Sequence, residues 1–220
     1  CALPILNITM KRAQLAKSLD DVYVCTDSEE IANVVHSHGG KPIITKSEHT
    51  NGTERIAEAA ESLEADLFVN IQGDEPLVDP NHIESVIAEH SKHPEWDIIV
   101  PSLPIARPED PHIVKIVHDV NYRIIFLSRS VIPQPFNHRP GFFLKHLSVI
   151  SFKPAALQKY ASLKPSPLQI SESVELLRAL ENGMALGTVL LDGDSISVDI
   201  KEDYVRAKVL MISDEFRKLY

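Results

Sequence analysis

Short apolar runs alternate with amphipathic helical stretches over roughly the first 90 residues of this 220-residue chain. The runs at 21–25, 42–45 and 67–71 have the length of buried strands, and in the stretches that follow them apolar residues recur every three or four positions. Strands that alternate with helices of this length imply parallel β-α-β units, whose helices cover both faces of the sheet. We therefore predict an α/β fold built on a mostly parallel sheet.

The middle of the chain interrupts this alternation. Strand-like runs at 97–104, 113–118 and 122–127 follow one another with no helical stretch between them. They predict a smaller antiparallel insertion at about 105–147 within a single domain of residues 1–220. The remaining predicted elements are helices at about 154–162 and 167–182, a strand at 187–191 and a last helix at about 202–218.

The composition narrows the classes of partner. A net charge of −9 argues against nucleic acid and against an anionic membrane surface, and no apolar run is long enough to span a bilayer. Two cysteines give no disulfide framework, so we expect a reducing, cytoplasmic location. An anionic substrate such as a nucleotide would need a metal ion or nearby Arg and Lys side chains.

Acidic residues follow three of the predicted strands, at the sheet edge where ligands bind in open α/β folds. We interpret Asp27 as a helix cap or turn residue. The segment Gln72-Gly73-Asp74 instead offers an amide, a close backbone approach and a carboxylate at one strand end. Asp74 and Asp199, which come from different strand ends, would suit Mg²⁺, since this ion takes few protein oxygens. The alternative that both are cap or turn residues stays open.

Five segments resemble those of the CMP-Kdo synthetases, the 3-deoxy-manno-octulosonate (Kdo) cytidylyltransferases, and they occur along the chain in the same order as in that family. They are Asn-Ile-Gln-Gly-Asp-Glu-Pro-Leu at 70–77, His-Thr-Asn-Gly-Thr-Glu-Arg at 49–55, Ser-Arg-Ser-Val-Ile-Pro at 128–133, Pro-Ser-Pro-Leu at 165–168 and Val-Asp-Ile-Lys-Glu-Asp at 198–203. The resemblance covers nearly the whole chain. It implies a Rossmann-like nucleotidyltransferase fold.

The resemblance also implies a reaction. CTP and a 3-deoxy-ulosonic acid would give the CMP-sugar and pyrophosphate, in the cytoplasm, for lipopolysaccharide or other surface-polysaccharide assembly. Asp74 and Asp199 would be the catalytic residues that hold Mg²⁺. The insertion at about 105–147 would pair two subunits, so we expect a homodimer.

Further site residues follow from the same resemblance. The implied nucleotide-binding residues are Asn51, Gly52, Arg55 and Gln72, and the implied sugar-binding residues are Gln72, His146, Glu172 and Glu175. Because Glu172 and Glu175 are three apart in a predicted helix, both can face one ligand. A solvated helix face is the alternative for this pair, and a structural role is the alternative for His146.

The chain departs from the family's pattern on the sugar side. Ile150, Lys153 and Leu176 stand where many members have tyrosine, arginine and glutamine. A pocket that loses polar contacts should prefer a different sugar acid, so a modified relative such as 8-amino-Kdo is credible. The rival interpretations are a cytidylyltransferase for nine-carbon sialic-type acids and a non-catalytic nucleotide-binding relative.

A second departure concerns the N-terminal region. The family's loop Pro-Ala-Arg-x-x-Ser-x-Arg-Leu-Pro-Gly-Lys, whose Arg and Lys hold the CTP phosphates, is absent. Ala2 to Ile8 resembles the stretch just after that loop, and Thr9 to Ala13 resembles a helix that should start several residues later. We therefore expect residues to be missing before Ala2 and between Ile8 and Thr9.

Overall fold

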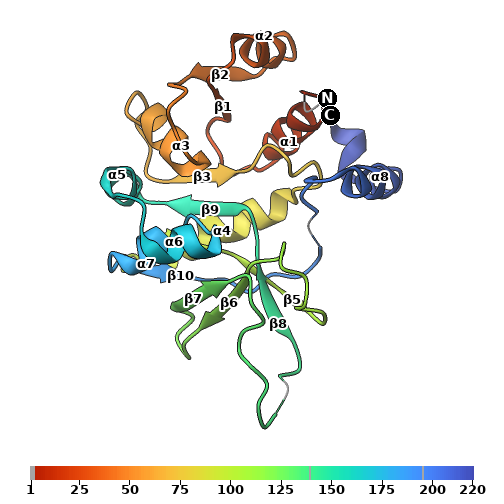
Figure 1. The fold of residues 1–220 in the computed structure, drawn as a ribbon. Helices are drawn as coiled ribbons and strands as arrows, with labels where there is room; N and C mark the ends of the chain where they lie inside the picture. Colours follow the sequence, from red (N-terminus) through yellow and green to blue (C-terminus); the bar gives the residue numbers. More distant parts are fainter. Residues whose placement is uncertain (1–2, 139, 195) are drawn as a thin grey trace. The chain divides into compact units, whose positions relative to one another are not determined.

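The structure is a computed structural model that describes residues 3–138, 140–194 and 196–220. Its internal contacts divide the chain into two compact units, whose elements are labelled in Figure 1. The first unit comprises Cys1–Glu64, Ile71–Glu84 and Asp194–Tyr220, and the second comprises Ala65–Asn70 and Ser85–Gly193. That residues 1–220 form a single domain stays a prediction.

The first unit contains a parallel β-α-β motif. Strands β1 (Tyr23–Thr26) and β2 (Lys41–Ile44) pair in parallel, with Tyr23 opposite Lys41, and helix α2 (Glu29–Ser37) connects them. Ser28 caps the start of α2, since its hydroxyl accepts a hydrogen bond from the Ile31 amide at 3.3 Å. The core of this motif comprises Met10, Val24 and Val35, with Leu6, Val22 and Ile31 packed against it.

Helix α1 (Leu3–Ala13) precedes this motif and contains the predicted join between Ile8 and Thr9. It runs without interruption through Ile8 and Thr9, and the Thr9 hydroxyl donates to the Ile5 carbonyl one turn earlier, at 3.1 Å. That residues are missing between Ile8 and Thr9 stays a prediction, since a continuous helix of the residues present does not test it. The expected segment before Ala2 lies outside the described residues.

The first unit also contains the loop at 72–78, here called the acidic loop, which carries Asp74 and Glu75. Its other elements lie before and after this loop in the sequence or near the C-terminus. They are α3 (Gly52–Ala60), the beginning of α4 (Pro80–Lys92), α8 (Lys201–Leu210) and the 3₁₀ helix η1 (Phe216–Leu219). The predicted last helix at about 202–218 is thus shorter than expected and is followed by a separate 3₁₀ turn.

The second unit contains a four-stranded sheet in the order β10-β4-β9-β3. The strands are β10 (Leu186–Gly187), β4 (Ile98–Ile99), β9 (Val149–Phe152) and β3 (Phe68–Ile71), of which only the last residue of β3 belongs to the first unit. β10 and β4 are parallel, whereas β4 and β9 are antiparallel, so the sheet is mixed. Gly187 allows Trp96 to pack tightly, because a Cβ there would lie 1.9 Å from the indole.

A second sheet of this unit is the predicted antiparallel insertion. Its order is β5-β8-β6-β7, formed by β5 (Ser102–Ile105), β8 (Phe143–His146), β6 (Lys115–His118) and β7 (Ile124–Ser128), and Figure 1 shows these strands lying together. Every strand pair in it is antiparallel, as predicted. Lys115 is fully buried, and its ammonium donates to the carbonyls of Asp110 and Arg129 at 2.9 and 2.5 Å.

Three helices follow the mixed sheet's strand β9. Helix α5 (Pro154–Ser162) has the predicted bounds. The single helix predicted at 167–182 is wrong, since the structure has α6 (Pro167–Glu172) and α7 (Leu177–Glu181). The break lies at Ser173, whose φ of 52° is left-handed. The Arg129 guanidinium donates to the carbonyls of Glu172 and Ser173 at 2.9 and 3.2 Å, and so takes acceptors that a longer helix would use.

Two predicted strands also differ from the structure. The run at 97–104 forms two short strands, β4 and β5, and the strand predicted at 187–191 is confined to Leu186–Gly187 plus an isolated bridge at Leu190.

Over the described ranges, no helix is both long and apolar enough to cross a bilayer.

Candidate active site

The loop that carries Asp74 is supported by α1 within the first unit. The Thr9 hydroxyl donates to the Gly73 carbonyl at 3.2 Å, and the Arg12 guanidinium donates to the Val78 carbonyl at 2.6 Å. Both side chains come from one helix face, because Thr9 and Arg12 are three residues apart. Helix α1 therefore holds the loop at both ends.

The segment that carries Asp199 is fixed against the same loop. The Val198 amide donates to the Asp74 carbonyl at 2.9 Å, and the Ser197 hydroxyl donates to the buried carboxylate of Glu75. On the other side of Asp199, the Asp203 carboxylate accepts from the Asp199 amide at 3.3 Å and caps α8. The predicted approach of Asp74 and Asp199 is present, although Asp199 follows a non-strand segment instead of a strand end.

The Asp74 carboxylate lies in an electrostatically unfavourable place. Its Oδ1 is buried and has no hydrogen-bond partner among the described residues. Burial raises the pKa of Asp74 to about 6, and the nearby negative charges of Glu75 and Asp199 act in the same direction. A positive charge placed here would relieve both the desolvation and the repulsion.

These carboxylates fit a magnesium ion. The buried, unpartnered Oδ1 of Asp74 is a free oxygen ligand, and Asp199 is exposed and within electrostatic reach of it. Across the described residues, no group of three or more His, Cys, Asp or Glu side chains could hold a metal ion on its own. Mg²⁺ commonly takes only one or two protein carboxylates and completes its shell with water and substrate phosphates, so two carboxylates are sufficient.

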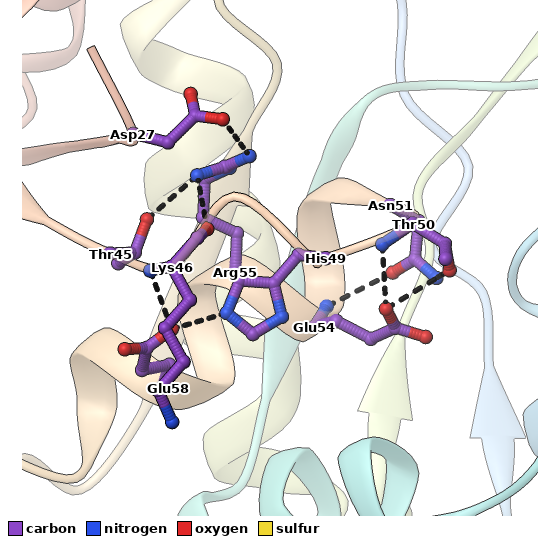
Figure 2. A network of polar contacts seen from close by, with 9 residues as sticks. All are labelled: Asp27, Thr45, Lys46, His49, Thr50, Asn51, Glu54, Arg55 and Glu58. Carbon is purple, nitrogen blue, oxygen red and sulfur yellow. Dashed lines mark hydrogen bonds and ion pairs between the residues drawn. The ribbon is translucent and has the colours of Figure 1, made fainter.

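The predicted nucleotide-binding residues Asn51 and Gly52 start helix α3. The Asn51 side chain accepts from the Glu54 amide at 2.9 Å, and the Glu54 carboxylate accepts from the Thr50 amide at 2.9 Å (Figure 2). This reciprocal pair is a capping arrangement. A Cβ at Gly52 would meet nothing within 4 Å in the described chain. Asn51 therefore has a structural role in α3, whatever it binds.

Arg55 occupies the centre of the network in Figure 2. Its guanidinium donates to the Thr45 hydroxyl at 2.7 Å and to the Lys46 carbonyl at 3.2 Å, and it lies 3.4 Å from the Asp27 carboxylate. Of the two alternatives for Asp27, the helix cap is wrong, because the neighbouring Ser28 caps α2, whereas Asp27 lies in a bend between β1 and α2. The Asp27–Arg55 ion pair orients the guanidinium and leaves it partly exposed.

A histidine–carboxylate contact lies beside Arg55 in the same network. The His49 imidazole contacts the Glu58 carboxylate, which also accepts from the Lys46 amide at 3.1 Å (Figure 2). These two contacts tie the segment after β2 to α3. Gln72, the remaining predicted nucleotide-binding residue, is exposed at the start of the acidic loop, where its amide is open to a ligand.

The predicted sugar-side residues lie in the second unit, and two of them do not have the expected arrangement. The Glu172 carboxylate accepts from the Ser128 hydroxyl at 2.7 Å and from the Arg129 amide at 2.8 Å. Glu172 ends α6, whereas Glu175 follows the break at Ser173. The prediction that both glutamates share a helix face is therefore wrong.

His146 ends strand β8, and its imidazole is half-buried. Burial, followed by the positive charge of Arg129, lowers the pKa of His146 to about 4. The imidazole is thus neutral at pH 7, when it offers one donor and one acceptor nitrogen. A neutral imidazole suits a sugar hydroxyl better than it suits a carboxylate.

The three departures from the family's pattern are also placed by the structure. Ile150 and Leu176 are 1% and 0% exposed, so they belong to the core of the second unit. The Lys153 ammonium donates to the Pro94 carbonyl. A fully buried side chain does not touch a bound sugar, so Ile150 and Leu176 act on sugar choice only through the residues packed around them.

Comparison with known proteins gives the family. Residues 2–196 match the model of a family described as cytidylyltransferase. The chain belongs to the cytidylyltransferase family. The predicted resemblance, the nucleotidyltransferase fold and the enzyme class are therefore confirmed.

Two relatives of this cytidylyltransferase are named for two related sugar acids. The 3-deoxy-manno-octulosonate cytidylyltransferase of Chlorobium phaeobacteroides (strain BS1) is 41% identical over 206 residues, which cover 91% of this chain and 83% of that protein. The 8-amino-3,8-dideoxy-manno-octulosonate cytidylyltransferase of Shewanella sp. (strain ANA-3) is 37% identical over 207 residues, which cover 91% and 84%.

Solved structures agree with the fold of this cytidylyltransferase. A CMP:2-keto-3-deoxy-manno-octonic acid synthetase complexed with CTP has a TM-score of 0.90 and 29% identity, covering 95% of this chain and 88% of that one. A putative glucose-1-phosphate thymidylyltransferase from Bacillus anthracis has a TM-score of 0.68 at 15% identity, covering 97% and 84%, and shows the fold alone.

The sequence did not indicate several residues that support this site. Thr9, Arg12 and Ser197 hold the two carboxylate-bearing segments, and Asp27 pairs with Arg55. Two supporting residues had a signal: Asp27 follows a predicted strand, although its pairing with Arg55 was not expected, and Glu75 directly follows Asp74 in the quoted motif.

Proposed function

We propose that this protein transfers the cytidylyl group of CTP to a 3-deoxy-octulosonic acid, either Kdo or its 8-amino relative, and releases pyrophosphate. The observation that carries the proposal is the unpartnered, buried oxygen of Asp74 beside Asp199, in a chain that belongs to the cytidylyltransferase family. The relatives named for Kdo and for 8-amino-Kdo support this substrate class over nine-carbon sialic-type acids.

The reaction forms one bond and breaks another. The anomeric hydroxyl of the sugar attacks the α-phosphorus of CTP, the bond to the β-phosphate oxygen breaks, and the hydroxyl proton is lost to solvent. Asp74 and Asp199 would hold Mg²⁺. When bound, this ion neutralises phosphate charge and eases loss of the hydroxyl proton. The protein's contribution is positioning and charge neutralisation, as in other phosphoryl transfers.

On the nucleotide side we assign binding to the start of α3 and to the acidic loop. Arg55 is oriented by Asp27 and stays partly exposed, so its guanidinium can meet an anionic or carbonyl acceptor. The exposed amide of Gln72 and the region around Asn51 and Gly52 complete the candidate nucleotide-binding residues.

On the sugar side we assign binding to His146 and Glu175. A neutral His146 can exchange hydrogen bonds with sugar hydroxyls. Because the Glu172 carboxylate is used by Ser128 and Arg129, we assign Glu172 the role of holding that turn in place instead of contacting the sugar.

The setting and assembly of the enzyme are part of the same proposal. CTP as co-substrate and the free thiol of Cys25 fit the cytoplasm, and the product fits lipopolysaccharide assembly. The insertion exposes large apolar side chains, which supports a homodimer formed through it. They are Val120, Tyr122, Ile125, Phe136 and Phe142.

The test is pyrophosphate release by purified protein with CTP and Mg²⁺ and one of three sugar acids: Kdo, 8-amino-Kdo or N-acetylneuraminic acid. Release with one or both octulosonic acids is the expected result. Release with N-acetylneuraminic acid alone would overturn the substrate class. Silence across the panel from folded protein that binds CTP would favour the non-catalytic alternative.

A further inference from the structure

Glu75 is a buried carboxylate that the proposed reaction does not use directly. It is 2% exposed and accepts a hydrogen bond from the Ser197 hydroxyl, 122 residues further along the chain. A buried carboxylate is costly unless hydrogen bonds compensate it. This one also repels the charge of Asp74 next to it. A residue with two such costs in the loop of a candidate active site needs an explanation beyond packing.

The Glu75–Ser197 contact links the two segments that carry the site's carboxylates. Asp74 lies one residue before Glu75, and Asp199 lies two residues after Ser197. These segments also share a backbone contact, in which the Val198 amide donates to the Asp74 carbonyl at 2.9 Å. A backbone bond alone would let the segment that carries Asp199 rotate about it, whereas an added side-chain bond fixes its orientation.

Asp199 itself depends on this orientation. Its side chain is exposed, and its amide is held only at 3.3 Å by Asp203, at the start of α8. On the N-terminal side of Asp199, the Ser197 hydroxyl thus adds a side-chain contact to the backbone contact of Val198. Groups that orient metal ligands from behind typically change metal affinity or activity by about 10- to 100-fold when they are removed.

We infer that Glu75 is a positioning residue: through the Ser197 hydroxyl it fixes the carboxylate of Asp199 opposite that of Asp74 for a shared divalent cation. This inference rests on the proposed metal-binding role of Asp74 and Asp199. It assigns a role to the second acidic residue of the loop that is distinct from ligation.

The test measures Mn²⁺ binding to the protein by electron paramagnetic resonance, with Mn²⁺ alone as the probe. Ser197→Ala removes the hydroxyl without changing any charge, and we expect it to raise the Mn²⁺ Kd about tenfold. Ser197→Thr keeps a hydroxyl and should stay within about twofold of the unchanged protein. A purely structural role would lower the melting temperature of Ser197→Ala and leave the Mn²⁺ Kd unchanged.

A matched control exists in the same unit. The Ser18 hydroxyl donates to the Glu84 carboxylate at an exposed position, so Ser18→Ala breaks the same kind of pair away from Asp74 and Asp199. We expect Ser18→Ala to leave the Mn²⁺ Kd unchanged. A tenfold change in this control as well would overturn the inference, because the effect would then not be specific to the Asp199 segment.

A double variant shows whether the contact acts through Asp199. In an Asp199→Asn background, Ser197→Ala should add less than about twofold to the Mn²⁺ Kd, since the group that it positions is already altered. A full tenfold effect in that background, or wild-type Mn²⁺ affinity in Ser197→Ala alone, would overturn the inference and leave the proposed function intact. Absence of Mn²⁺ binding by the unchanged protein would instead overturn the metal assignment and the inference together.

Discussion

Two carboxylates, one in each unit, have opposite surroundings. In the first unit, Asp74 has a buried oxygen with no hydrogen-bond partner among the described residues, and its neighbours Glu75 and Asp199 repel it. In the second unit, Glu172 accepts from the Ser128 hydroxyl and from the Arg129 amide at 2.7 and 2.8 Å. The sequence motifs assigned both residues to the binding of ligands.

The contrast separates groups that bind a ligand from groups that hold the fold. A carboxylate whose oxygens already have donors stabilises the folded state, and its loss leaves those donors unsatisfied. A carboxylate in a desolvated and repulsive place lowers stability until a cation binds, which is typical of functional sites. Asp74 should therefore matter for turnover, and Glu172 for stability.

The largest expected effect is on turnover. Asp74→Asn should lower pyrophosphate release by about 10³-fold, because it removes a carboxylate that would hold Mg²⁺, the cation that neutralises phosphate charge in the transition state. Asp79→Asn is the matched control, since Asp79 lies just beyond the same loop and its carboxylate accepts from the Asn81 amide at 2.8 Å. It should retain turnover within about threefold. Near-normal turnover in Asp74→Asn would contradict the interpretation that Asp74 binds a ligand whereas Glu172 stabilises the fold.

The next effect is on stability in the second unit. Glu172→Ala should lower the free energy of unfolding by about 2–3 kcal/mol, because the Ser128 hydroxyl and the Arg129 amide lose their acceptor. Urea denaturation followed by circular dichroism measures this change. Unchanged stability would show that the two hydrogen bonds contribute nothing net, and that Glu172 is as available to a ligand as Asp74.

The stability of the second unit should depend on pH through His146. The pKa of His146 is lowered from 6.5 to about 4 in the folded state, so between these values the unfolded chain binds more protons. Stability attributable to His146 is then lost as the pH falls from about 6.5 to 4, and we expect a loss of about 1–2 kcal/mol between pH 7 and pH 5. His146→Gln should show a smaller loss over this interval in urea denaturation. An identical pH dependence in both proteins would contradict the desolvated environment of His146.

The smallest effect is the stability of the metal-free first unit. With EDTA present at pH 7, Asp74→Asn should raise the free energy of unfolding by about 1 kcal/mol, since it removes a desolvated charge beside Glu75 and Asp199. The value allows for solvent screening, because Asp74 is only half-buried. Thermal unfolding with and without EDTA measures it. A loss of stability in this variant would mean that the carboxylate has a structural partner after all.

The elements with strong local signals were predictable from the sequence. The recurrence of apolar residues every three or four positions predicted α2, and the apolar runs predicted β1 and β3. The break between α6 and α7 was not predictable, because no glycine or proline marks it. It depends on Arg129, more than 40 residues earlier, which takes the carbonyls of Glu172 and Ser173.

The same distinction holds for the site. The approach of Asp74 and Asp199 followed from the rule that ligands bind at one edge of an α/β sheet. The side chains that hold them could not be predicted in this way, since Ser197 meets Glu75, and Thr9 meets Gly73, across long separations in the sequence. Contacts of this kind leave no periodic pattern. The roles of the individual site residues stay predictions.

Arg12 connects the C-terminal segment of the chain to the acidic loop. The residue is 2% exposed, and its guanidinium donates to the Val78 carbonyl, pairs with the Asp214 carboxylate and lies 5.0 Å from the Phe216 ring centroid. One buried cation thus connects the loop that follows Asp74 to residues some 140 positions further on. Shortening the protein after Ile212 would leave that cation without its counter-charge, so damage at the tail would reach the acidic loop through α1.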